Sequence, residues 1–66
     1  MTAWNQLPAE GRDLISRANN LVMGAVGAAL DTPTPDTWMT VGDARVVFVE
    51  ACHAYGITPE DALPHV

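Results

Sequence analysis

The run Leu21–Leu30, LVMGAVGAAL, constrains this chain more than any other stretch, because it carries no charge and no polar side chain. Ten apolar residues are too few to cross a bilayer, which takes about 20. The run therefore predicts a helical segment that is buried within a protein. Gly24 and Gly27 lie inside it, and glycine destabilises a helix unless its lack of a side chain serves a contact.

Apolar residues recur at helical spacing on both sides of this run. One line alternates in steps of four and three: Leu14, Ala18, Leu21, Ala25 and Ala28. A second line runs beside it: Ile15, Val22, Val26 and Ala29. The pattern predicts one helix over 8–30 with a broad apolar face, and we expect this face to pack on a second helix. Pro8 suits the first helical position, and Asp13 and Arg17 have the spacing of an ion pair.

A second helix is expected after a proline-containing linker. Residues 31–39, DTPTPDTWM, contain two prolines, which keep the residues before them out of the helical conformation. Thr40 and Asp43 have the spacing of a capping box, so we expect a helix over 41–55 with Gly56 as its C-terminal cap. Its core stripe consists of Val41, Ala44, Phe48, Ala51 and Tyr55, with Cys52 beside it. The β-branched composition around residues 45–50 leaves a buried strand there as the alternative.

A short third helical turn is expected at about 59–63. Thr58 is a capping residue, Pro59 suits the first helical position, and Pro64 ends the turn. The chain is therefore predicted to be all-α and to form one small domain over 1–66. Its parts are an N-terminal arm (1–7), an antiparallel helical hairpin (about 8–30 and 41–55) and the C-terminal turn.

The size of the chain predicts a partner. A domain of about 60 residues buries only about 60% of its unfolded surface, and such chains usually need disulfides, a metal or another subunit. Cys52 is the single cysteine, so an internal disulfide is excluded. We therefore expect a homo-oligomer, a protein partner, or both.

Some residues of such a hairpin have no partner within the chain. We expect the protein interface to combine small and apolar residues of the first helix with valines of the second: Met23, Gly24, Gly27, Leu30, Val46 and Val49. Small residues allow another helix to approach closely. The alternative is that the two glycines accommodate the chain's own second helix or tail.

The charge of the chain bears on its partners and its compartment. The net charge is −5, with three arginines and no lysine, which argues against nucleic acid and anionic membranes as partners. The N-terminus lacks the basic start and apolar stretch of a signal peptide, so we expect the cytoplasm of a bacterial cell or infected host rather than secretion. The absence of lysine beside abundant Ala, Val and Asp is typical of a high-GC genome, such as that of an actinobacterium or its phage.

No chemical site is predicted. Cys52 and His53 are adjacent, and neighbours on a helix point about 100° apart, so they do not form a chelating pair. The chain has no Cys-x-x-Cys or His-x-x-x-His spacing, so we expect no metal, cofactor or catalytic residue. The glycine turn before residue 58 has the outline of a helix-turn-helix. Two features argue against DNA recognition: Pro64 stops the following helix after one turn, and Glu60 and Asp61 lie where contacts with DNA would be needed.

These patterns predict a non-enzymatic interaction or structural protein that acts by binding another protein or by self-assembly. A phage accessory protein or virion component belongs to this class. No small-molecule substrate is evident from the sequence. The alternative is a small transcriptional or nucleic-acid-associated regulator, which would act through protein contacts or weakly on DNA through Arg12, Arg17 and Arg45.

Overall fold

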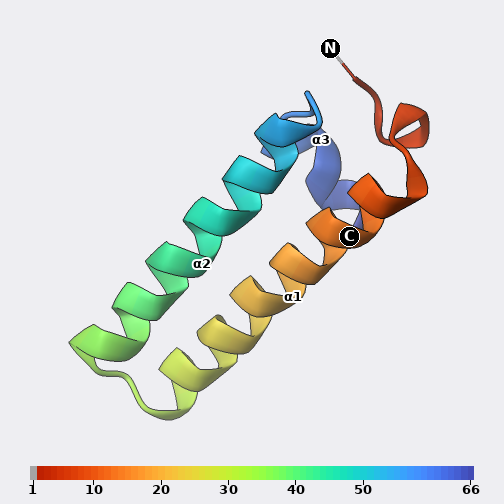
Figure 1. The fold of residues 1–66 in the computed structure, drawn as a ribbon. Helices are drawn as coiled ribbons and strands as arrows, with labels where there is room; N and C mark the ends of the chain where they lie inside the picture. Colours follow the sequence, from red (N-terminus) through yellow and green to blue (C-terminus); the bar gives the residue numbers. More distant parts are fainter. Residues whose placement is uncertain (1) are drawn as a thin grey trace.

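Two long antiparallel helices make up most of the molecule (Figure 1). The computed structural model describes residues 2–66, so Met1 of the predicted arm lies outside the described residues. The elements, in chain order, are η1 (Trp4–Gln6), α1 (Ala9–Asp31), α2 (Pro35–Ala54), α3 (Pro59–Ala62) and η2 (Leu63–His65). No strand occurs in residues 2–66, so residues 45–50 are helical, and the predicted all-α helical hairpin is confirmed.

Helix α1 matches the predicted helix 8–30 to one residue at each end. Pro8 precedes the first helical residue in an extended conformation and serves as the N-cap. The backbone N–H of Thr32 donates to the carbonyl of Ala28 over 2.9 Å and closes the last turn. The predicted pair of Asp13 and Arg17 is confirmed, with 3.0 Å between Nε and Oδ2 on the surface of the helix.

The predicted start of the second helix is wrong, because α2 begins at Pro35 rather than at residue 41. Thr34 is the N-cap, and its hydroxyl accepts the backbone N–H of Thr37 at 3.2 Å. The hydroxyl of Thr37 in turn accepts the backbone N–H of Thr34 at 3.0 Å. Proline at the first helical position leaves no N–H without a partner, so Pro35 initiates the helix instead of preventing it.

The predicted linker 31–39 therefore shrinks to the residues between Asp31 and Pro35. The expected capping role of Thr40 is also wrong. Thr40 lies inside α2, where its hydroxyl donates to the carbonyl oxygen of Asp36 over 3.0 Å. Because Thr40 lies inside the helix, its hydroxyl bonds to the carbonyl four residues earlier and does not cap a helix N-terminus.

The C-terminal end of α2 follows the prediction closely. Gly56 has a φ of 73°, the left-handed conformation that favours glycine, and it reverses the chain after the helix. The N–H of Ile57 donates to the carbonyl of Cys52 over 3.1 Å, as in a Schellman motif. Thr58 then caps α3 by accepting the N–H of Asp61 at 3.2 Å, which confirms the predicted third turn.

The core lies at the end of the hairpin that is distant from the loop. Its buried residues come from the arm, both long helices and the C-terminal segment: Leu7, Ile15, Ala18, Phe48, Cys52, Ile57 and Ala62. The two ends of the chain meet over this core. The N–H of Thr2 donates to the carbonyl of Gly56 over 3.2 Å, and the rings of Trp4 and His65 stack with their centroids 5.4 Å apart.

Helix α2 covers only half of the apolar face of α1. The second apolar line of α1 faces the core, where Ile15 and Ala29 are fully buried. The expectation that the broad apolar face packs on α2 is wrong for Leu14 and Leu21, because Leu14 is 47% exposed and Leu21 is 62% exposed. A single neighbouring helix covers only one side of a helix. Helix α2 covers the side of α1 that carries Ile15, which belongs to the core cluster.

Candidate protein-binding surfaces

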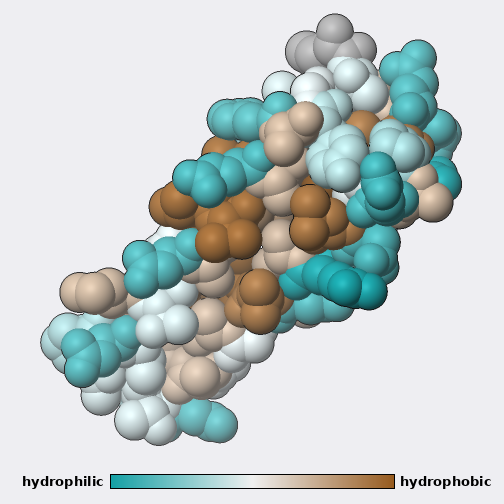
Figure 2. Space-filling model, viewed as in Figure 1, coloured by the Kyte–Doolittle hydropathy of each residue, from teal (hydrophilic) through white to brown (hydrophobic). Residues whose placement is uncertain are grey.

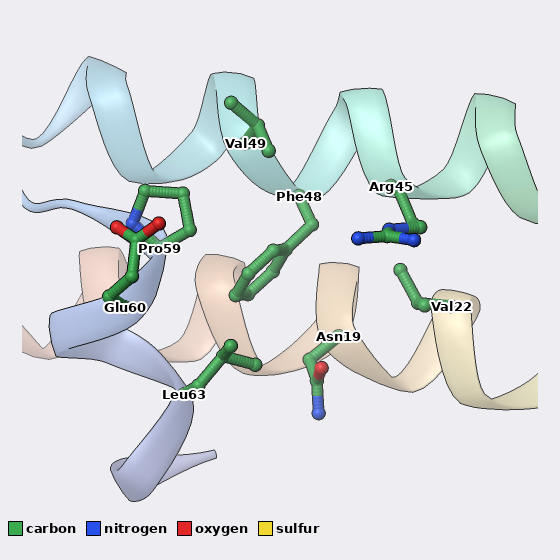
Figure 3. A pocket seen from close by; sticks show the side chains of 8 residues that line it. All are labelled: Asn19, Val22, Arg45, Phe48, Val49, Pro59, Glu60 and Leu63. Atoms are coloured by element: carbon green, nitrogen blue, oxygen red, sulfur yellow. The ribbon is translucent and has the colours of Figure 1, made fainter.

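One broad side of the hairpin carries α3 and a groove. Figure 3 shows Pro59, Glu60 and Leu63 of the C-terminal segment across from residues of α1 and α2. The groove has a volume of about 270 Å³, and its lining combines apolar side chains with three polar ones: Asn19, Val22, Arg45, Phe48, Val49, Pro59, Glu60 and Leu63. A groove of this size and lining can accept an apolar side chain of a partner. Its only charged side chains are those of Arg45 and Glu60.

The other broad side of the hairpin has no such cover. Seen as in Figure 1, with α3 behind the hairpin, Figure 2 shows hydrophobic side chains gathered along the middle of this side and hydrophilic ones along its edges. Residues seven apart on a helix point in nearly the same direction, so Leu14, Leu21 and Ala28 share this side of α1. We call the apolar part of this surface the open face, and it consists of Leu14, Leu21, Ala25, Ala28, Ala44, Val47 and Ala51. Thr40, seven residues before Val47, lies beside it towards the loop.

The large side chains of the open face come from both helices. Val47 of α2 is 48% exposed, and Leu21 of α1 is the most exposed of the three large residues. The groove sets the register of the hairpin, because Val22 stands opposite Arg45 there, and Asn19 opposite Phe48 (Figure 3). The same register puts Leu21 opposite residue 46, so Leu21 and Val47 lie within about 2 Å of the same level along the hairpin.

The open face holds no charge in its middle. Its seven residues are all apolar, and the ion pair of Asp13 and Arg17 lies at its edge on α1. A contiguous apolar surface bordered by polar groups is typical of a protein–protein contact. It offers nothing that would bind a phosphate or polarise a substrate.

Of the six predicted interface residues, three share the groove side of the hairpin. Val49 lines the groove, and Met23 and Leu30 follow the groove residue Asn19 by four and eleven positions, within about 40° of its direction on α1. Met23, Leu30 and Val46 are well exposed, and Leu30 is the most exposed of them at 69%. On their helices, however, they point away from the open face, and Val49 is half-buried in the groove. Their contact with a partner stays a prediction.

Gly24 and Gly27 of α1 differ in their relation to the open face. A β-carbon added at Gly24 or Gly27 would meet no atom within 4 Å in residues 2–66. The alternative, that they accommodate the chain's own second helix or tail, is therefore wrong for the described residues. Gly24 borders the open face, because it lies three and four residues from Leu21 and Ala28, whereas Gly27 lies on the far side of α1.

Leu14, Leu21 and Val47 were not among the predicted interface residues. The signal that indicates them is the width of the apolar face of α1, which has two parallel lines of apolar residues. A single helix packed against α1 buries one such line and leaves the other uncovered. Only the position of α2 decides which line stays exposed.

The thiol and the imidazoles do not form a common site. Cys52 is fully buried in the core, whereas the neighbouring His53 is exposed. Burial raises the pKa of the Cys52 thiol, and the negative charge of Glu60 raises it further. His65 stacks on Trp4 at the joined ends of the chain. Within residues 2–66, no three His, Cys, Asp or Glu side chains are grouped so that they could hold a metal ion.

Comparison with known proteins gives no family model that matches the sequence, and no curated protein or solved structure that is significantly similar to it. None of the helices in the described part of the chain is both long and apolar enough to cross a membrane. The surfaces of the hairpin are therefore the basis for a functional argument.

Proposed function

We propose that this protein is a non-enzymatic interaction protein that acts through self-association by way of the open face. The observation that carries the proposal is the exposure of Leu14, Leu21 and Val47 on one uncharged side of the hairpin. Single exposed apolar residues are normal on protein surfaces, but a contiguous group on one side has a free-energy cost in water that a partner removes.

The small core supports the same proposal. The largest fully buried side chains are Ile15, Ile57 and Cys52, and the cluster that contains them lies at one end of an elongated molecule of 39 × 17 × 14 Å. Along the loop half, the main packing within the described residues is that of α1 on α2. A second molecule on the open face would bury the apolar residues that the chain's own helices leave uncovered.

The proposal is tested by the mass of the protein in solution over a concentration series. Multi-angle light scattering or sedimentation equilibrium should give a mass above the 7.0 kDa of one chain, and the mass should rise with concentration towards a fixed multiple. A mass of 7.0 kDa at all concentrations up to the millimolar range would contradict self-association.

A further inference from the structure

We infer that the occupant of the open face is a second copy of this chain, and that the two hairpins form an antiparallel four-helix bundle. The two-fold axis runs across the helices and passes between the copies at the level of Leu21 and Val47. In this arrangement α1 lies on α1 of the second copy and α2 lies on its α2, with the two loops at opposite ends. The inference rests on the proposed self-association and adds its geometry.

The spacing of the apolar residues matches such a bundle. The first line of α1 alternates in steps of four and three from Leu14 to Ala28, which is the heptad pattern of helices that pack at shallow angles in bundles. In the hairpin alone this line lies at the edge of the contact with α2, and the line through Ile15 lies at its centre. A second hairpin on the open face places the heptad line in the middle of the apolar core.

The side of the hairpin that carries the open face is large enough for a stable dimer. The two longer dimensions of the molecule, 39 and 17 Å, outline a side of roughly 650 Å² before the relief of the side chains is counted. Specific interfaces bury roughly 600–1,000 Å² on each partner, so one side of the hairpin is enough. Neither α3 nor the groove residues of the C-terminal segment cover this side, because they lie on the opposite one (Figure 3).

The distribution of large and small side chains selects the antiparallel arrangement. The large residues Leu14 and Leu21 occupy the half of α1 near the core, and Gly24, Ala25 and Ala28 occupy the half near the loop. With the loops at opposite ends, Leu14 of each copy meets the small residues around Ala28 of the other. With the loops at the same end, α1 lies on α2 of the other copy, and the small residues of the loop half, Ala25, Ala28 and Ala44, meet only small residues and leave voids.

On α2 the same axis passes by Val47. It brings Val47 of the two copies together and sets Ala44 of each copy opposite Ala51 of the other. The surface is thus complementary to itself about one axis on both helices, as an isologous interface requires.

Two pairs of matched variants test the face. Leu21→Glu and Val47→Glu each place a charge on the two-fold axis and should shift the protein to the monomer, with at least a tenfold weaker association. Leu30→Glu and Val46→Glu alter residues of the same types and similar exposure that point away from the open face, and they should leave the association unchanged. If the hairpin folds only as a dimer, Leu21→Glu should lose helical circular dichroism at a concentration at which Leu30→Glu keeps it. The inference is overturned if the controls disrupt association and the open-face variants do not.

Disulfide trapping in a Cys52→Ala background tests the orientation. Leu21→Cys, and separately Val47→Cys, should form a disulfide between copies under mild oxidation, in which the two thiols lose two electrons and two protons to oxidised glutathione. Leu14→Cys should not link to itself, because the two copies of residue 14 lie about 20 Å apart along the bundle. It should link to Ala28→Cys when the two variants are mixed.

The outcomes distinguish the inference from the proposed function. A parent chain that associates, but with Leu14→Cys linking to itself and Leu21→Cys not, would overturn the antiparallel bundle and leave self-association standing. A parent chain that stays at the mass of one copy would overturn both.

Discussion

The aromatic ring of Tyr55 lies directly on the backbone of Gly11. A β-carbon built at Gly11 would be 2.8 Å from both Cδ1 and Cε1 of the ring, closer than real contacts allow. This close approach joins the first turn of α1 to the end of α2, at the end of the hairpin where the core lies.

The contact predicts opposite effects of one substitution at two glycines of the same helix. Gly11→Ala should lower the free energy of unfolding by about 1 kcal/mol. The ring of Tyr55 must shift to make room for the new methyl group, and the cost of this shift exceeds the gain in helix propensity. Gly27→Ala has open space around the new methyl group and should raise it by about 0.5–1 kcal/mol. Urea unfolding monitored by circular dichroism measures both, and equal effects at the two positions would contradict the role of Tyr55.

The start of α2 predicts that the substitution of alanine for threonine has different effects on stability at Thr34 and at Thr40. Thr34→Ala removes the side chain that accepts the N–H of Thr37 and should cost about 1 kcal/mol of stability. Thr40→Ala removes only a hydroxyl that bonds back to Asp36 within the helix, and alanine has the higher helix propensity. We therefore expect Thr40→Ala to leave the unfolding midpoint unchanged or slightly raised. A larger loss at Thr40 than at Thr34 would place the helix start at residue 41 after all.

Cys52 should behave as a buried, protonated thiol. Its raised pKa means that the folded state favours the neutral form, so this contribution to stability is fully present at neutral pH. It is lost as the pH rises above the ordinary thiol value of about 8.5 and through the raised pKa. The free energy of unfolding should therefore fall as the pH rises above about 8.5, and Cys52→Ala should remove part of that fall. A thiol reagent at neutral pH should modify the native chain only as fast as it unfolds.

Self-association should tighten with added salt. Each chain has a net charge of −5, so two copies repel one another, and the open face holds no ion pairs for salt to weaken. Raising the ionic strength from about 0.02 to about 0.5 M should lower the dissociation constant a few-fold, which sedimentation equilibrium can follow. A dissociation constant that rises with salt would indicate that charged groups hold the copies together, and it would contradict the open face as the contact.

The all-α hairpin and most of the helix ends follow from local features of the sequence. Helical periodicity and capping residues act over three or four neighbouring positions, so Thr58, Pro59 and Gly56 could be interpreted without knowledge of the fold. The same Thr-Pro signal at Thr34 and Pro35 was obscured by Pro33 before it and by the competing box at Thr40.

Which side of α1 is buried depends instead on how distant segments of the chain pack together. Both apolar lines of α1 have helical spacing, so local sequence cannot choose between them. The choice depends on where α2 can lie while Ile15 also meets the arm and the C-terminal segment in one core, and that is a property of several distant segments packed together. The consequence is that Leu21 lies exposed beside Val47, although both belong to apolar runs that would suit a buried position equally well.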